Sequence, residues 1–339
     1  MQGTIFGLDL AKRIFQLHWI DAQTGEICRR QLRRGQLVEF FANRAPGVIA
    51  MEACGGAHYW GRKLTEMGHE VRLIAAQRVR PFVQGNKNDA ADAQGIWEAV
   101  QRPKMKFVAL KSEAQQAILS LHRMREQLAK MRTMQVNQLR GLLAEFGADL
   151  PQGRQRGMER IPAELEQLAE RLPAMVIEAL RDQVARIASF DTDIAGIEEK
   201  LTLWMRENKA AKMLMAIPGV GLLTATAAVA TIGDTAVFKN GREFAAFVGL
   251  VPRQHGTGGK VKLLGISKRG DVYLRTLLIH GARTVITHAK QREPWLEKLL
   301  ARRPLNVAVV ALANKMARTI WALLFHDRTY LRGYAARAA

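Results

Sequence analysis

Two short apolar segments near the N-terminus each contain one acidic residue, and this feature constrains the fold more than any other. Asp9 lies in Ile5-Phe-Gly-Leu-Asp-Leu-Ala-Lys12, and Glu52 lies in Val48-Ile-Ala-Met-Glu-Ala53. Both segments are typical of buried strands, in which an unpaired charge is expensive. We therefore expect the fold to place a compensating cation beside these carboxylates.

Two further acids, Asp89 and Asp92, lie three residues apart at the start of a predicted helix. This spacing puts both carboxylates on one helix face. Carboxylate oxygens are hard ligands that suit Mg²⁺ or Mn²⁺. Two such ions, about 3.5–4 Å apart, can activate the attacking oxygen and stabilise the leaving oxygen of a phosphodiester. The four acids together predict a metal site for phosphodiester chemistry.

Each of these acids, taken alone, also has a simpler interpretation. Asp9 could cap a turn, and Glu52 could pair with an arginine. Asp89 could be the N-cap of the helix, and Asp92 could be a first-turn charge favoured by the helix dipole. These interpretations make different predictions about which side chains meet.

The charge of the chain indicates a polyanion partner. The 339 residues carry a formal net charge of +20, with a pI near 10.5. Residues 101–140 hold 9 Lys and Arg against 2 Asp and Glu, and residues 239–303 hold 14 against 4. Residues 159–207 lie between them and hold 6 against 11. Two basic segments separated by an acidic one favour nucleic acid as the partner, with a generally basic protein as the alternative.

Several features favour a cytoplasmic protein without membrane contacts. Cys28 and Cys54 are the only cysteines, too few for a disulfide framework and without zinc-site spacing. No basic and apolar leader precedes the first strand. The uncharged stretch 213–233 contains a Pro-Gly turn, and charged residues interrupt the apolar stretch 304–325.

The first hundred residues alternate between strand and helix signals. Strands are predicted over 4–10, 15–21, 26–32, 47–53 and 70–76. Helices are predicted over 35–44 and 59–67, around Arg78 and from Asp89. Three strands followed by alternating helix and strand are the order of a ribonuclease H-like (RuvC-like) α/β domain, predicted over 1–105. In that fold the functional acids occupy the first strand, the fourth strand and a late helix.

A helical segment, 106–210, is predicted next. One long helix spans 113–146, with Leu121, Met124, Leu128 and Met131 at heptad-like spacing. A second spans roughly 163–207 and also carries an apolar stripe. We expect a helical hairpin or a dimerising coiled coil, and hence a homo-oligomer.

The remaining residues, 211–339, predict a mainly α-helical domain. Ile217-Pro-Gly-Val-Gly-Leu222 resembles a helix-hairpin-helix turn, in which the N–H groups near Gly219 and Gly221 can face a DNA phosphate. An ordinary tight turn between helices is the alternative. A Gly- and Lys-rich loop is predicted over 255–267, followed by helices over 270–290 and 304–326.

Ser267 has basic surroundings, namely Lys260, Lys262, Lys268, Arg269 and Arg275. A serine near phosphate-binding cations can attack a phosphodiester and form a covalent link to DNA. The alternative is that Ser267 is the N-cap of the following helix.

Six motifs in order resemble the DEDD transposases of bacterial insertion sequences, some of which are guided by a bridge RNA. The motifs are Gly7-Leu-Asp-Leu-Ala-Lys12, Met51-Glu-Ala53, Asn88-Asp-Ala-Ala-Asp92, Ile217-Pro-Gly-Val-Gly221, Phe244-Ala-Ala-Phe-Val-Gly-Leu-Val-Pro-Arg253 and Ser267-Lys-Arg-Gly270. The resemblance implies a RuvC-like domain, a coiled coil and a transposase domain. It implies that Asp9, Glu52, Asp89 and Asp92 bind Mg²⁺ and that Ser267 forms a phosphoserine link, with composite sites in a dimer or tetramer.

The resemblance also implies that a noncoding RNA selects the DNA sequences while the protein holds backbone and shape. The predicted backbone contacts are Lys87, Arg29, Arg30, Arg33, Arg34 and the basic run 101–140. Two other functions remain open. One is a RuvC-like junction resolvase or nuclease that uses water in place of Ser267, and the other is a non-catalytic nucleic-acid-binding protein.

Overall fold

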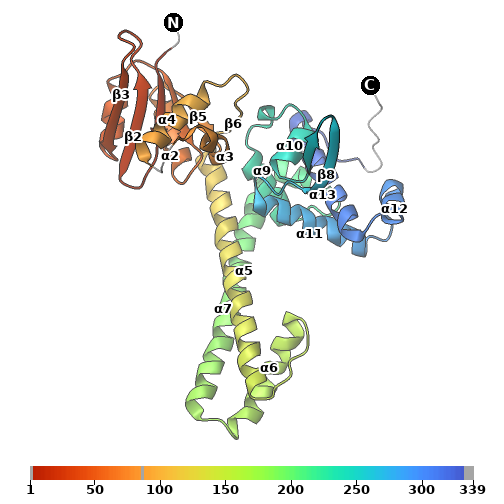
Figure 1. Ribbon diagram of the computed structural model, residues 1–339. Helices are drawn as coiled ribbons and strands as arrows, with labels where there is room; N and C mark the ends of the chain where they lie inside the picture. The colour runs from red at the N-terminus through yellow and green to blue at the C-terminus, as the bar shows by residue number, and fades with distance from the viewer. Residues whose placement is uncertain (1–2, 85–87, 332–339) are drawn as a thin grey trace. The chain divides into compact units, whose positions relative to one another are not determined.

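The N-terminal residues form a sheet whose elements follow the predicted order along the chain, three strands and then alternating helix and strand. The computed structural model describes residues 3–84 and 88–331. Its six-stranded sheet has the order β3-β2-β1-β4-β5-β6 (Figure 1). The first three strands are an antiparallel meander, β4 and β5 add parallel to β1, and β6 closes the edge antiparallel. The strands are β1 Ile5–Asp9, β2 Ile14–Ile20, β3 Ile27–Arg33, β4 Val48–Glu52, β5 Glu70–Ile74 and β6 Phe107–Val108.

Helices cover both faces of this sheet because buried residues alternate along its strands. Phe6 and Leu8 of β1 pack with Trp60 and other residues of α1 (Gln36–Ala42) and α2 (Ala57–Glu66). On the opposite face, Ala50 and Ile74 pack with α3 (Ala76–Val79), the 3₁₀ turn η1 (Arg80–Phe82) and α4 (Asp89–Val100). The predicted mixed α/β domain is therefore confirmed.

The described residues fall into two compact units. The first comprises the residues up to Gln116 together with Ile232–Lys239, which include the 3₁₀ turn η2 (Thr235–Val237). The second comprises Ala117–Thr231 and the residues from Asn240 onward. The three-domain division of the sequence stays a prediction, because the second unit contains both its middle and its C-terminal segment.

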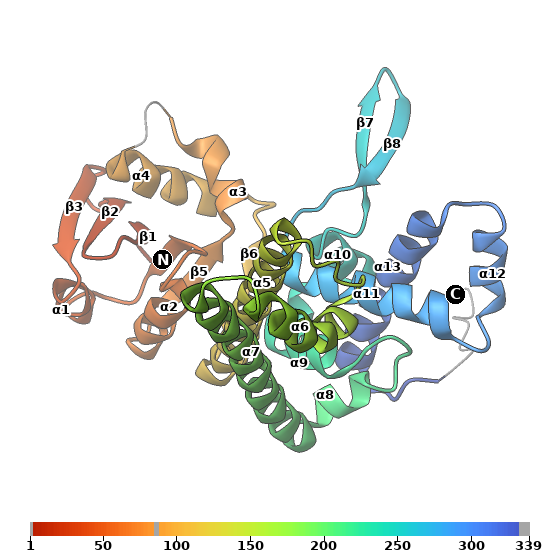
Figure 2. The ribbon, with the colours of Figure 1, turned by 90° about the horizontal axis from the view of Figure 1, so that it is seen from below.

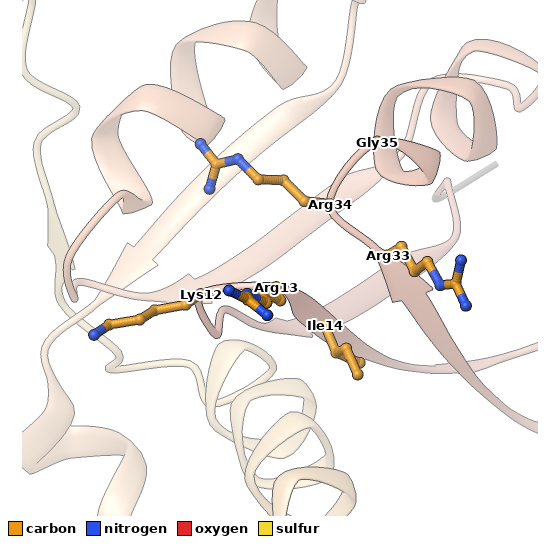
Figure 3. Close-up of a pocket in the computed structure, with 6 residues that line it drawn as sticks. All are labelled: Lys12, Arg13, Ile14, Arg33, Arg34 and Gly35. Atoms are coloured by element: carbon orange, nitrogen blue, oxygen red, sulfur yellow. The ribbon is translucent and has the colours of Figure 1, made fainter.

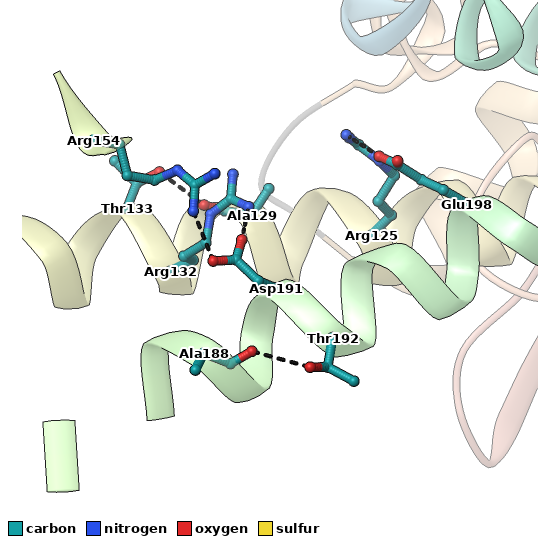
Figure 4. A network of polar contacts seen from close by, with 9 residues as sticks. All are labelled: Arg125, Ala129, Arg132, Thr133, Arg154, Ala188, Asp191, Thr192 and Glu198. Carbon is teal, nitrogen blue, oxygen red and sulfur yellow. Dashed lines mark hydrogen bonds and ion pairs between the residues drawn. The ribbon is translucent and has the colours of Figure 1, made fainter. Parts of the chain in front are cut away.

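Two long helices form an antiparallel pair in the second unit. Helix α5 (Glu113–Glu145) packs against α7 (Ala174–Glu207), and α6 (Arg154–Ala169) lies between them in sequence. Arg125 bonds Glu198 at 2.6 Å, and Arg132 bonds Asp191 at 2.5 Å, so the residue numbers run in opposite directions (Figure 4). The Asp191 carboxylate also accepts from the Arg154 guanidinium at 2.7 Å.

Two predictions for these helices are wrong. The helix expected over 163–207 is broken, because Pro173 has no N–H to donate and becomes the N-cap of α7. In α5, Met124 and Met131 are 55% and 40% exposed, so they are not part of the packed stripe. The buried face includes Ile118, Val136 and Leu139 instead, about one residue around the helix. Leu121 and Leu128 of the predicted stripe are partly buried and do pack against the core cluster that contains Ile118 and Leu201.

Helices make up most of the remaining chain, as expected, but the predicted loop over 255–267 is wrong. Figure 2 shows an extended two-stranded ribbon there, formed by β7 (Pro252–Thr257) and β8 (Lys260–Ile266). Gly258 and Gly259 have φ values of 56° and 79°, which a tight two-residue hairpin turn requires. The helices are α8 Lys209–Leu214, α9 Leu222–Ile232, α10 Gly241–Phe247, α11 Val272–His288, α12 Pro294–Leu300 and α13 Leu305–His326.

A buried polar network joins three helices of the second unit. His122 of α5 contacts the Tyr273 hydroxyl of α11 at 2.9 Å and the Thr226 hydroxyl of α9 at 3.0 Å. Because the Thr226 hydroxyl donates to the Leu222 carbonyl, it accepts from His122 Nε2, and Nδ1 then accepts from Tyr273. Burial, with a smaller effect of Arg125, lowers the pKa of His122 to about 4. The imidazole is therefore neutral near pH 7.

Within the described residues, α13 is long and apolar enough to cross a membrane by composition. Half of its most apolar window is buried. Helices α10, α11 and α12 pack against it. This packing matches the core helix of a folded domain.

Candidate metal site and serine turn

The strand register brings Asp9 and Glu52 to neighbouring strand ends. Leu8 of β1 pairs with Met51 of parallel β4, so the following two residues lie side by side. Both strands present their alternate residues to α4: a Cβ on Gly7 would lie 2.2 Å from the carbonyl oxygen of Ala93. Since side chains alternate, Asp9 and Glu52 also lie on the α4 face of the sheet.

Helix α4 supplies the other two acids from its first turn. Asn88 caps this helix, because its side chain accepts from the Ala90 N–H at 3.0 Å. The interpretation of Asp89 as the N-cap is therefore wrong. One carboxylate oxygen each of Asp9, Asp89 and Asp92 lie within 4.8 Å of one another. Acids from two distant segments thus meet at the N-terminus of α4.

Electrostatics couples Glu52 to this cluster. Burial raises the pKa of Asp9 to about 6, with further contributions from the charges of Asp92, Asp89 and Glu52. The pKa of Glu52 is also raised, first by burial and then by Asp92. Among the described residues, no lysine or arginine forms an ion pair with Asp9 or Glu52. Such a set of mutually repelling hard oxygen ligands fits divalent cations.

The same cluster makes Cys54 a poor nucleophile. Burial and the neighbouring Glu52 and Asp9 carboxylates raise the pKa of its thiol above the ordinary value. The thiolate is the reactive form of cysteine, so this environment suppresses thiol chemistry.

Two buried polar residues beside the acids were missed in the sequence. Gln16 lies directly opposite Asp9 in the β1–β2 ladder and is 6% exposed. His18 lies opposite Gly7, with its ring centroid 5.4 Å from that of Trp97. Burial, followed by the charge of Arg29, lowers the pKa of His18. Their alternation with the apolar Phe15 and Leu17 was the available signal, because it places both on the α4 face.

A basic pocket of about 380 Å³ lies where two turns of the first unit meet. Arg34 N–H donates to the Arg13 carbonyl at 2.9 Å, which joins the turns. Figure 3 shows the cationic side chains spread around the pocket rather than converging on one point. The lining residues are Lys12, Arg13, Ile14, Arg33, Arg34 and Gly35. Arg33 and Arg34 were predicted as nucleic-acid contacts, whereas Lys12 and Arg13 were missed.

The other predicted backbone contacts of this unit are dispersed. Arg29 donates to the Gln94 side chain at 3.2 Å on the α4 face. The Arg30 guanidinium lies 5.4 Å from the centroid of the Phe40 ring, on the opposite face. Alternation along β3 explains this separation, so adjacent arginines do not form one surface. Lys87 lies outside the described residues.

Ser267 lies in a turn between the ribbon and α11. Its N–H donates to the Val251 carbonyl at 2.8 Å, and its hydroxyl accepts from the Arg269 N–H at 3.4 Å. The N-cap of α11 is Asp271, which accepts from the Leu274 N–H at 2.8 Å. The alternative interpretation of Ser267 as the helix cap is therefore wrong. Lys268 and Arg269 are exposed beside this half-buried serine.

The cations near Ser267 differ in their surroundings. Lys260 and Lys262 are exposed on β8. Arg275, by contrast, is only 7% exposed, and its guanidinium donates to the carbonyls of Val248 and Arg269 at 2.8 Å each. This burial disfavours a direct phosphate contact of Arg275, which stays a prediction.

The Pro-Gly turn connects α8 and α9. Gly219 has a φ of 83°, and a Cβ there would lie 2.7 Å from the Gly281 carbonyl oxygen of α11. Close packing therefore requires this glycine, as expected for a tight interhelix turn. Gly221 is exposed, with nothing within 4 Å of its Cβ position. A phosphate contact at this turn stays a prediction.

Comparison with known families matches both parts of the chain. Residues 6–147 match a DEDD transposase family, and residues 211–298 match the family described as Transposase IS116/IS110/IS902. A probable family 20 transposase of Pseudomonas aeruginosa is 48% identical, over 96% of this chain and 98% of that protein. The transposase for insertion sequence element IS1111A of Coxiella burnetii is 44% identical, over 97% and 92%.

The chain belongs to the IS110 family of DEDD transposases. The transposase for IS1328 of Yersinia enterocolitica is also similar, at 39% identity over 94% of this chain. Membership implies an insertion-sequence transposase that cleaves and transfers DNA. DEDD transposases typically use a divalent metal, and in this transposase Asp9, Asp89 and Asp92 form the candidate cluster.

Proposed function

We propose that Asp9, Glu52, Asp89 and Asp92 of this transposase hold Mg²⁺ or Mn²⁺, two ions when fully loaded, in a RuvC-like domain. The observation that carries this proposal is the convergence of three carboxylates within 4.8 Å, with Glu52 coupled electrostatically to Asp9 and Asp92. When bound, such ions polarise the scissile phosphate and stabilise developing negative charge.

We propose further that the Ser267 hydroxyl attacks the scissile phosphate. A bond forms between Oγ and phosphorus, the bond from phosphorus to one deoxyribose oxygen breaks, and the released DNA hydroxyl takes up a proton. The half-buried position of Ser267, beside the exposed Lys268 and Arg269, supports this role. Those cations would offset the charge of the approaching DNA backbone.

Replacing Ser267 by Ala and Asp9 by Asn tests both proposals. Ser267→Ala is expected to abolish a covalent protein–DNA adduct detected by denaturing electrophoresis, and Asp9→Asn to abolish strand cleavage. Both variants should retain salt-sensitive DNA binding. Ser189→Ala is the matched control, because Ser189 is exposed on α7. Full recombination by Ser267→Ala would show that Ser267 is not the attacking group. If changing Asp9, Glu52 and Asp92 to amides causes no loss of function, the result would favour a non-catalytic nucleic-acid-binding protein.

We propose that the ribbon and the basic pocket contact the nucleic-acid backbone. His255 and Lys262 pair across the ribbon, and Thr257 pairs with Lys260, so these polar side chains share one face. Removing both lysines should reduce the slope of log affinity against log salt by about 0.9 for each phosphate that a lysine neutralised. An unchanged slope would show that this face does not contact the backbone.

We propose that a noncoding guide RNA and a homodimer or homotetramer complete the active transposase in the cytoplasm. The dispersed basic surfaces support an RNA partner, which should co-purify with the protein and carry a defined sequence. The exposed Met124 and Met131 on α5 support an assembly surface, here proposed to act as a coiled coil. Met124→Glu with Met131→Glu should lower the mass in light scattering. An unchanged mass would show that α5 and α7 pack within one chain only.

A further inference from the structure

We propose that Arg275 is a positioning residue, which locks the turn that presents Ser267. Its guanidinium joins two pieces of chain, the end of α10 and the turn itself. This inference rests on the proposed role of Ser267 and adds a residue that acts through that serine. It also replaces the expected phosphate contact of Arg275 with a different function.

The hydrogen bonds of Arg275 occupy one guanidinium nitrogen completely. Nη1 carries two hydrogens, and it donates to the Val248 carbonyl and the Arg269 carbonyl at 2.8 Å each. Val248 is the C-cap of α10, where the helix dipole and an unpaired carbonyl both favour a cation. A buried guanidinium with these partners stabilises the folded turn and does not face solvent.

Backbone contacts fix the same turn from the other side. The N–H groups of Ser267 and Lys268 donate to the carbonyls of Val251 and Gly249, at 2.8 and 3.2 Å. A Cβ on Gly249 would lie 2.2 Å from the Arg269 carbonyl oxygen. A Cβ on Gly270 would lie 1.7 Å from the Phe247 carbonyl oxygen. The turn therefore has little space in which to shift while Arg275 holds it.

The backbone conformation of Lys268 explains why the turn requires an additional contact to hold it. Its φ is 55°, a left-handed conformation that is unfavourable for a residue with a Cβ. Such a conformation persists only where the surrounding structure enforces it. Arg269 directly follows Lys268, and its carbonyl accepts a hydrogen bond from Arg275. This bond attaches the turn to the first turn of α11. Without that anchor, we expect the Ser267 hydroxyl to sample several positions and to attack phosphate more slowly.

If Arg275 instead contacted a phosphate directly, its loss would change DNA affinity and not the rate of attack on bound DNA. A direct phosphate contact would contribute to DNA affinity and to its salt dependence. A positioning residue affects the rate of attack after DNA is bound, so saturating DNA does not rescue its loss. Arg269, which is exposed in the same turn, is the matched comparison for a phosphate contact.

The experiment uses full-length Arg275→Met, with Arg283→Met as the control. Arg283 is exposed on the same helix, where it bonds the Asn306 side chain at 3.2 Å. In Arg275→Met, amide hydrogen exchange at Ser267 and Lys268 should accelerate about tenfold or more, since the bonds that protect them lose their anchor. The rate of covalent adduct formation at saturating DNA should fall by a similar factor. DNA affinity and its salt slope should stay unchanged, and Arg283→Met should match the wild type.

Two results would overturn the proposal. One is unchanged hydrogen exchange at Ser267 and Lys268. The other is a reduced salt slope with a normal adduct rate at saturating DNA, which would restore the phosphate contact. If Arg275→Met does not fold, Arg275→Lys keeps the cation but removes the planar group that reaches both carbonyls, and it should give the same exchange and rate defects.

The exchange measurement also separates this proposal from the nucleophile proposal. If Ser267→Ala still forms the adduct, the serine is not the nucleophile. Hydrogen exchange in Arg275→Met still decides whether Arg275 locks the turn, because that readout needs neither DNA nor catalysis.

Discussion

Asp9→Asn should stabilise the metal-free protein while it abolishes strand cleavage. Burial and three neighbouring carboxylates raise the pKa of Asp9 from 3.8 to about 6. Ionised Asp9 therefore lowers the free energy of unfolding. An uncharged amide of the same shape does not have this effect. Where like charges are held together at a site for a cation, replacing one of them by a neutral group is expected to stabilise the metal-free protein.

The magnitude follows from the size of the pKa change. A rise of roughly two pKa units corresponds to about 3 kcal/mol at 1.36 kcal/mol per unit. Asp9 is only partly buried, and solvent screening reduces this figure to about 1–2 kcal/mol. The folded state binds the proton more tightly than the unfolded state. Stability therefore falls as pH rises from about 4 through about 6, and the full cost applies above pH 6.

Urea denaturation of the full-length protein, followed by tryptophan fluorescence in EDTA, measures this effect. At pH 8, Asp9→Asn should be more stable than the wild type by about 1–2 kcal/mol, and the difference should vanish near pH 4. Added Mg²⁺ should stabilise the wild type but not the variant. Asp149→Asn, which alters an exposed carboxylate in the second unit, should change neither result.

Equal stabilities of wild type and Asp9→Asn in EDTA at pH 8 would refute the reasoning. That result would mean that the four carboxylates do not repel one another in the folded protein. Mg²⁺ stabilisation of Asp9→Asn equal to that of the wild type would separately remove Asp9 from the metal site.

Three further predictions concern the second unit. His122→Leu should cost about 1–3 kcal/mol in urea denaturation, because it removes the acceptor for the Tyr273 hydroxyl and the N–H that donates to the buried Thr226 hydroxyl. Since the pKa of His122 is lowered to about 4, its contribution should be complete above pH 6.5 and fall as pH drops toward 4, a loss absent from the variant. Gly270→Ala should lower the melting temperature and the adduct rate together, because its Cβ would lie 1.7 Å from the Phe247 carbonyl oxygen. Asp191→Asn should cost about 1 kcal/mol, and a double-mutant cycle with Arg132→Met should show coupling between the two residues.

The local part of this structure was predictable from sequence. The first five predicted strands match the observed ones within about two residues at each end, because buried strands carry a strong apolar signal. Helix caps were less predictable. Asn88 and Asp271 cap α4 and α11, although Asp89 and Ser267 were plausible caps, since neighbouring polar residues can make the same bond. The ribbon was missed because its strands are exposed almost throughout and show no burial pattern.

The burial and the contacts of the charged side chains depended on the tertiary structure. The basic pocket includes Lys12 and Arg13 because two turns distant in sequence meet there. Arg275 resembles the exposed Lys268 and Arg269 in sequence, yet it is buried against carbonyls of another segment. A sequence records that a residue is charged, but the partner that its charge meets is set by long-range packing.

The sequence by itself determined that Asp9 and Glu52 lie on buried strands and that Asp89 and Asp92 share one helix face, because apolar runs and a spacing of three residues are local signals. Only the tertiary structure brought Asp89 and Asp92 to Asp9, since that meeting depends on how α4 packs across β1 and β2. The periodicity of apolar residues extends over a few positions, so the sequence alone shows it and predicts the local strand or helix. Convergence of distant segments reflects the packing of the whole core, which no single segment specifies.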